Sequence, residues 1–205
     1  MQSPPKCSGM QAFAVLVTAT QLLLLLTVFC TTAYSADAFI STEMQAPGSS
    51  LRVLLTIFVA GTTGVCLAYV HVRAGRSPRL AWALLGAAAA LGGWAALALT
   101  DLQTPGHVAG TLVYVGGAGV SALVMLDVTP APQAVYLAGY AAVAVFALLF
   151  GTLDAAGYLA ASALFEWAAF TTHTATLLAF FITHPFEKGR KALVELRALL
   201  GSMAA

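Results

Sequence analysis

The chain has 205 residues, of which 60% are hydrophobic and only 8% are charged. A water-soluble domain needs about 25% charged residues to cover its surface, so this composition excludes a soluble globular protein and indicates that lipid surrounds most of the chain. The net charge of +1 offers no basic surface for nucleic acid, and the 3 cysteines are too scattered for a disulfide scaffold or a zinc site.

A helix needs about 20 apolar residues to cross about 30 Å of hydrocarbon. Six segments meet that requirement, over residues 11–33, 52–72, 80–100, 107–126, 133–152 and 158–183, with turn-forming stretches between them. The runs are continuous and do not alternate, which argues against membrane-spanning strands. The sequence therefore predicts an all-α, polytopic membrane protein with a six-helix transmembrane bundle over residues 1–186. A cytoplasmic amphipathic tail over residues 187–205 is expected to follow it.

The first segment also has features of a secretory signal peptide, because Lys6 precedes the apolar run and small residues follow it at 33–36. The run is longer than the hydrophobic region of such a peptide. We therefore expect this segment to be retained as the first span.

The basic residues predict the orientation of the bundle. Lys6, the arginines of the second loop and the basic residues after the last span lie on one side of the membrane. The opposite loops carry acidic residues and a single basic residue, Arg52, at the start of the second span. Because cytoplasmic loops are enriched in Lys and Arg, both termini are expected to face the cytoplasm.

The longest connection, residues 34–50, is polar but contains the apolar residues Phe39, Ile40 and Met44. Long loops of this kind are often functional, although packing alone also explains such apolar residues. We expect this loop to fold back over the lumenal end of the bundle.

Small residues are concentrated in the third and fourth segments. In lipid, close backbone approach through small side chains replaces the hydrophobic effect as the force that joins helices. Gly106 and Gly110 form a Gly-x-x-x-Gly pattern at the start of the fourth segment, and Gly117 lies further along it. The pattern predicts helix packing, within this chain in preference to a dimer interface. Trp82, Trp94 and Trp167 lie mostly toward span ends, where we expect their rings to anchor at the headgroups.

Few ionisable residues lie inside the spans. Glu166 is eight residues into the last segment, roughly 12 Å below its lumenal end, and His173 follows on nearly the same face. His107 opens the fourth segment on the lumenal side. A carboxylate at such depth is usually neutralised, paired or directed at a wet cavity. Glu166 therefore belongs either to a polar pocket for a lipid headgroup or a proton, or to a structural hydrogen bond. For His173 the structural interpretation is favoured, because neighbouring threonines offer local partners.

Patterns for covalent or metal catalysis are absent from the sequence. The 3 lysines lie outside the spans, so none can carry retinal, and the 4 histidines lie at different depths. Neither a zincin pair of histidines nor a Gly-x-Ser-x-Gly motif occurs. We therefore expect no catalytic residue, no metal site and no cofactor.

Several short motifs occur in a characteristic order. Phe39-Ile40-Ser41 and then Pro47-Gly48 stand in the first loop, His107-Val108-Ala109-Gly110 opens the fourth segment, and Ser162 to Trp167 reads Ser-Ala-Leu-Phe-Glu-Trp. On six spans, this order resembles the DRAM (damage-regulated autophagy modulator) family and its Frag/Sfk superfamily, which includes Golgi proteins that remodel GPI lipids. Residues 42–46 depart from the family pattern in the first loop. The resemblance implies an endomembrane (lysosome or Golgi) or plasma-membrane protein linked to autophagy or lipid handling, without established catalytic residues.

These observations together predict a non-catalytic protein that binds or senses lipid in the lumenal leaflet. Its site would be a polar recess between His107 and Glu166, roofed by the loop that carries Phe39. Membrane lipids are the expected partners, and a membrane-protein partner or a second copy is a further alternative. The alternatives for function are an accessory subunit of a large membrane complex, a GPI-lipid-remodelling factor, or a small channel or transporter. A channel is disfavoured because few polar residues match Glu166 and His173 in depth.

Overall fold

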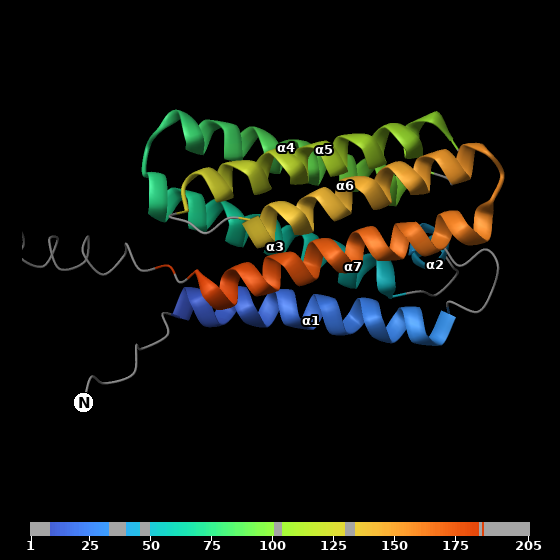
Figure 1. Ribbon diagram of the computed structural model, residues 1–205, viewed down its shortest axis with the longest axis horizontal. Coiled ribbons are helices and arrows are strands. Elements are labelled where there is room, and N and C mark those ends of the chain that lie inside the picture. The colour runs from blue at the N-terminus through green and yellow to red at the C-terminus, as the bar shows by residue number, and fades with distance from the viewer. Residues whose placement is uncertain are drawn as a thin grey trace, which may run out of the picture.

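The computed structural model describes residues 9–32, 40–45, 50–100, 104–129, 134–184 and 186. Within these residues, all regular structure is helical. The helices are α1 (Gly9–Thr32), α2 (Ile40–Gln45), α3 (Leu51–Ala74), α4 (Pro78–Leu99), α5 (Pro105–Asp127), α6 (Ala134–Ala155) and α7 (Leu159–Thr183). Figure 1 shows the long helices side by side, with the short α2 at one end of the bundle.

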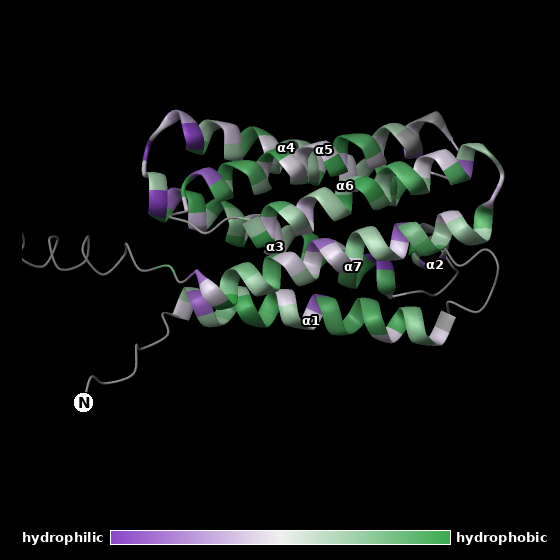
Figure 2. Ribbon diagram, viewed as in Figure 1, coloured by the Kyte–Doolittle hydropathy of each residue, from purple (hydrophilic) through white to green (hydrophobic). Residues whose placement is uncertain are grey.

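The long helices have the dimensions and composition of membrane spans. Among the described residues, 5 helices are long and apolar enough to cross a membrane: α1, α3, α4, α5 and α6. The remaining long helix, α7, has 25 residues, but it contains Glu166, His173 and several threonines, which make it less apolar. Figure 2 shows hydrophobic residues along the helices and hydrophilic ones gathered at the turn between α3 and α4. The predicted all-α membrane bundle is therefore confirmed.

The start of α1 and the end of α7 lie at the same end of the bundle. The side-chain amide of Gln11 donates a hydrogen bond to the backbone carbonyl of Phe181. The turn that carries Arg73, Arg76 and Arg79 lies at this end as well (Figures 1 and 2). This arrangement is what an even number of spans requires, and the cytoplasmic orientation of this end stays a prediction. The predicted amphipathic tail at 187–205 lies outside the described residues.

Turn residues fix where several helices begin and end. α4 and α5 each start with a proline, Pro78 and Pro105, whose missing N–H is no loss in a first helical turn. Thr104 caps α5, because its Oγ1 accepts a hydrogen bond from the backbone N–H of His107 at 3.3 Å. α3 is followed by Gly75, whose φ of 61° favours glycine. The two proline breakers thus predict the starts of α4 and α5 to within a few residues.

The long helices form a ring in which the neighbours pack in the order α5, α4, α3, α1, α7, α6. In addition, α3 contacts α5. The helices α5 and α6 follow one another in the chain. In the part of the chain that the structure describes, however, they do not form one of the closely packed helix pairs. The ring is therefore open between α5 and α6.

The closest helix pair is α4 with α5, whose backbones touch. A Cβ atom added to Gly93 would lie 2.3 Å from the backbone nitrogen of Tyr114, and one added to Gly117 would lie 2.3 Å from that of Ala90. A Cβ atom on Gly110 would lie 2.8 Å from the backbone nitrogen of Leu97. Such separations are possible only for glycine, so the structure places Gly110 and Gly117 in an interface within the chain.

Gly106 has a smaller part in this interface. Its added Cβ atom would meet only side-chain atoms of the adjoining turn, the nearest being Cγ2 of Thr100 at 3.2 Å. The residue is exposed. The second glycine of the Gly-x-x-x-Gly pattern therefore contacts α4 more closely than the first.

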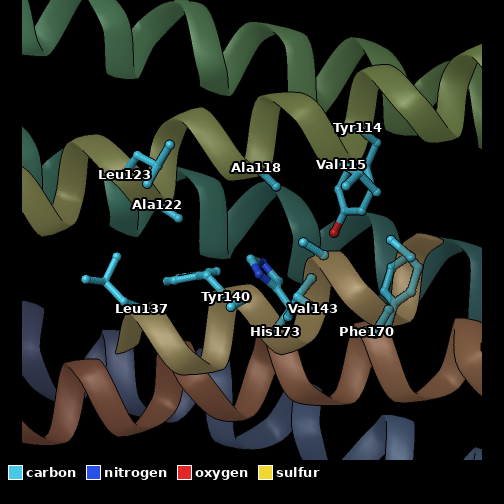
Figure 3. Close-up of a pocket in the computed structure, with 15 residues that line it drawn as sticks. Tyr114, Val115, Ala118, Ala122, Leu123, Leu137, Tyr140, Val143, Phe170 and His173 are labelled. Atoms are coloured by element: carbon cyan, nitrogen blue, oxygen red, sulfur yellow. The ribbon is translucent and has the colours of Figure 1, made fainter. Parts of the chain in front are cut away.

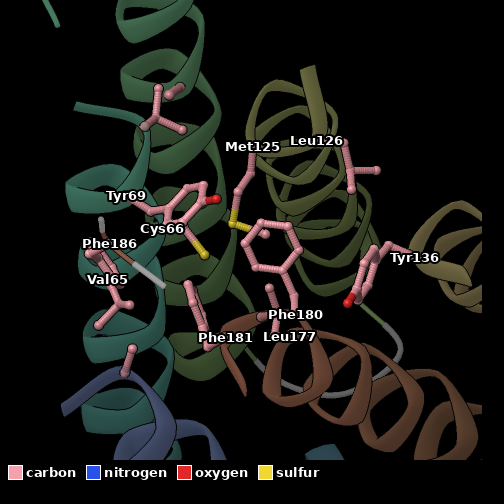
Figure 4. Close-up of a cluster of buried hydrophobic side chains, with 13 residues drawn as sticks. Val65, Cys66, Tyr69, Met125, Leu126, Tyr136, Leu177, Phe180, Phe181 and Phe186 are labelled. Atoms are coloured by element: carbon pink, nitrogen blue, oxygen red, sulfur yellow. The ribbon is translucent and has the colours of Figure 1, made fainter. Parts of the chain in front are cut away.

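Two clusters of buried side chains fill the ends of the bundle. In the cluster of Figure 4, the Tyr69 ring of α3 lies 5.1 Å from the ring of Phe180 and 5.1 Å from that of Phe186. The other cluster contains Trp94 and Trp167, which are only 2% and 3% exposed. The expectation that the tryptophans mostly anchor at headgroups is therefore wrong for these two. Trp94 instead donates a hydrogen bond from Nε1 to Thr56 Oγ1 at 2.9 Å.

Paired substitutions test the contact between α4 and α5. Gly93→Ala and Gly117→Ala should each lower the free energy of unfolding by about 1–3 kcal/mol, because the new methyl group overlaps the facing backbone. Gly92→Ala and Gly116→Ala, one residue away, place the methyl group in open space and should not destabilise the protein. Differential scanning fluorimetry of the purified variants in detergent measures the difference. Equal melting temperatures within each pair would contradict the interface.

Candidate functional site

Glu166 is a buried anchor point for the short helix α2. Its side chain is 7% exposed, and Oε2 accepts a hydrogen bond from the backbone N–H of Ile40 at 2.7 Å. Ile40 is the first residue of α2, where backbone N–H groups have no partner within the helix. The carboxyl group therefore supplies a hydrogen-bond acceptor that this helix end needs.

Residues 40–45, in the described part of the first loop, fold back onto the bundle. Ile40 and Met44 are almost completely buried, and α2 contacts α3, α4 and α7. The expected fold-back is thereby confirmed for residues 40–45. Phe39, the predicted roof of a polar recess, lies outside the described residues.

His107 lies near the start of α5. Its side chain is buried, and its Nδ1 atom has no hydrogen-bond partner in the part of the chain that the structure describes. α5 packs chiefly on α4, whereas α7 packs on α6 and α1. Neither His107 nor Glu166 lines the two cavities described below. The predicted recess between these two residues therefore has no counterpart in those cavities.

A cavity of about 400 Å³ lies between α5, α6 and α7, at the opening of the ring (Figure 3). Alanine, valine and leucine side chains from α5 and α6 form most of its wall, and Ala169, Phe170 and His173 contribute from α7. Leu123 and Leu137 are 59% and 46% exposed and belong to the same wall. The cavity therefore opens sideways, toward the surface that faces lipid.

Three side chains with polar groups line this apolar cavity, namely those of Tyr114, Tyr140 and His173. The rings of Tyr140 and His173 lie 5.9 Å apart, and the ring of Tyr114 stacks on that of Phe170 at 5.6 Å. Among the described residues, the Tyr140 hydroxyl is buried without a hydrogen-bond partner. In Figure 3 the Tyr114 hydroxyl oxygen points into the same space as the His173 ring. Three side chains that carry polar groups thus line one apolar space.

The threonines near His173 do not serve as its partners. Thr174 donates a hydrogen bond to the carbonyl of Phe170 at 3.0 Å, and Thr176 donates to that of Thr172 at 2.7 Å. Both hydroxyls therefore bond to the backbone of their own helix. The expectation that neighbouring threonines are the partners of His173 is therefore wrong for Thr174 and Thr176. The structure instead places His173 in the wall of the cavity.

A smaller cavity of about 30 Å³ adjoins the first, toward the centre of the bundle. It shares Tyr114, Tyr140 and His173 with the larger cavity, and its other polar lining residues are Gln21, Thr62, Thr63 and Ser121. Thr62 donates a hydrogen bond from Oγ1 to Gln21 Oε1 at 2.8 Å. A volume of this size holds about one water-sized group. The larger apolar space thus borders a small chamber, called the polar chamber below, whose wall contains more polar side chains.

Sequence reasoning singled out His173 but missed Tyr114 and Tyr140. Both tyrosines lie within apolar segments and not at their ends, so their hydroxyls are polar groups placed at depth. The depth of these hydroxyls within apolar segments was the feature of the sequence that could have identified them as candidate site residues. Among the described residues, no group of three or more His, Cys, Asp or Glu side chains could hold a metal ion.

Comparison with models of known protein families, with curated proteins and with solved structures gives no match to this chain. The resemblance to the DRAM family therefore stays a prediction, carried by the short motifs alone.

The anchoring role of Glu166 is tested by two substitutions. Glu166→Leu removes the acceptor for Ile40 and should release α2, with a loss of about 1–3 kcal/mol in the free energy of unfolding. Glu166→Gln keeps an acceptor oxygen and should retain most of the stability. Hydrogen exchange of the amides in residues 40–45 measures the release directly. The anchoring role would be wrong if these amides stayed equally protected in Glu166→Leu.

Proposed function

We propose that this chain is a multi-pass, lipid-binding membrane protein that takes an apolar molecule from the bilayer into the cavity between α5, α6 and α7. The observation that carries this proposal is the cavity itself, about 400 Å³ of mostly apolar space with a few convergent polar groups. Small-molecule sites in proteins commonly have volumes of about 300–1,000 Å³ and this same mixture of linings.

The position of the cavity supports a ligand that arrives from the membrane. The opening coincides with the gap between α5 and α6, and its rim residues Leu123 and Leu137 are exposed on the outside of the bundle. In a bilayer, the outside of the bundle at this depth is hydrocarbon. A lipid molecule can therefore enter the cavity without passing through water.

The site differs from the one that the sequence suggested. Glu166 is engaged by α2, so it is not the central group of the proposed site. His173 takes that place, together with two tyrosines. Membership in the DRAM/Frag superfamily and a location in endomembranes or the plasma membrane belong to the same proposal, because the resemblance links such proteins to lipid handling.

A cavity-filling substitution tests this function. Ala144 is an exposed alanine of α6 that lines the cavity, whereas Ala138 is an exposed alanine of α6 that does not line it. Ala144→Phe should reduce photolabelling of α5 and α6 by a diazirine-bearing hexadecanol in nanodiscs to about a quarter or less, because the ring occupies the space of the ligand. Ala138→Phe should label as the unmodified protein does. Equal labelling of all three proteins at the cavity-lining residues would contradict the proposal.

A further inference from the structure

We infer that the ligand of this cavity is an uncharged lipid whose compact head carries a hydroxyl or carbonyl group, held by Tyr140, His173 and Tyr114. This inference rests on the proposed lipid-binding function and specifies the chemical class of the ligand. It follows from three features of the two adjoining cavities: their polar groups, their size and their charge.

The polar groups call for a hydrogen-bonding head. The Tyr140 hydroxyl is buried without a partner among the described residues, and buried polar groups are costly when left unpaired. A tyrosine hydroxyl both donates and accepts hydrogen bonds, and a neutral imidazole ring offers one donor and one acceptor. Figure 3 shows the Tyr114 hydroxyl oxygen of α5 and the His173 ring of α7 directed into one space, whose wall also contains Tyr140 of α6. A hydroxyl or carbonyl oxygen placed there satisfies them.

The size of the polar chamber calls for a compact head. The chamber next to Tyr140 and His173 measures about 30 Å³, enough for roughly one water-sized group. The phosphate and choline groups of a phospholipid are many times larger. The remaining volume of about 400 Å³ is lined mainly by aliphatic and aromatic side chains and suits the apolar body of the ligand.

The charges of the lining call for a neutral head. Among the described residues that line the two cavities, none is Lys, Arg, Asp or Glu. A charged headgroup placed there would lose its hydration without gaining an ion pair, which is strongly unfavourable. An anionic or cationic head is therefore disfavoured relative to an uncharged one of similar size.

Competition among amphiphiles that differ in the head tests the inference. The protein in phosphatidylcholine nanodiscs is photolabelled with a diazirine-bearing hexadecanol, and labelling of cavity-lining residues is mapped by mass spectrometry. Unlabelled competitors are hexadecanol, 2-heptadecanone, cholesterol, hexadecyl sulfate and hexadecyltrimethylammonium. The neutral class should compete at a mole fraction about tenfold lower than that of the two charged chains, as expected for two hydrogen bonds gained. The neutral competitor that acts at the lowest mole fraction shows whether the site prefers a flexible alcohol, a ketone or a sterol.

Variants connect that selectivity to the named side chains. Tyr140→Phe removes only a hydroxyl that has no partner in the described part of the chain, so the fold should persist while the neutral-over-charged preference falls about threefold, as expected for one of the two hydrogen bonds. His173→Phe should lower the preference in the same direction. Tyr158→Phe, at an exposed tyrosine that does not line either cavity, should leave it unchanged.

The outcomes separate this inference from the proposed function. In one outcome, Ala144→Phe abolishes the labelling, but charged and neutral competitors reduce it equally well. This result would overturn the assignment of the head and leave lipid binding in place. An unchanged preference in Tyr140→Phe and His173→Phe would also overturn it. Labelling that Ala144→Phe does not affect would overturn both proposals.

Discussion

The direct backbone contact between α4 and α5 is the constraint on which the rest of the bundle depends. Gly93 and Gly117 let the two helices approach to a distance that any side chain would prevent. In lipid, such contact is a main source of helix association. Because α5 presents its glycine face to α4, a different face, with Ala118 and Ala122, is left toward α6. The gap between α5 and α6, and the cavity within it, follow from this division of faces.

The polar groups inside the bundle fall into two kinds. Glu166, Gln21 and Trp94 each have a hydrogen-bond partner on another element, so they join segments that are far apart in the sequence. Tyr140 and Ser121, which line the cavities, have buried hydroxyls without a partner among the described residues. An unpaired polar group inside a membrane protein is expensive. His107 Nδ1 near the start of α5 is also without a partner among the described residues, but it lines neither cavity. Only Tyr140 and Ser121 belong to cavity walls, where there is room for a partner from outside the chain.

The sequence predicted the long helices because their signals are local. The apolar length is a property of each segment, and breakers such as Pro78 and Pro105 lie directly beside the segments that they delimit. The six residues of α2 are too few for a periodic pattern, and nothing near Glu166 in the chain indicates that Ile40 is its partner. The cavity depends on how three helices are placed relative to one another, which no single segment encodes. For the same reason the hydroxyls of Tyr114 and Tyr140 were not recognised as parts of a site.

For the lipid ligand that we propose, the sideways opening of the cavity has a consequence for how occupancy is set. A ligand that enters between α5 and α6 travels within the plane of the bilayer and exchanges with the surrounding lipid. Its occupancy then depends on its mole fraction in that membrane and not on its concentration in water. Two membranes with the same aqueous surroundings but different lipid compositions would therefore fill the site to different extents. The protein would report on the membrane in which it resides.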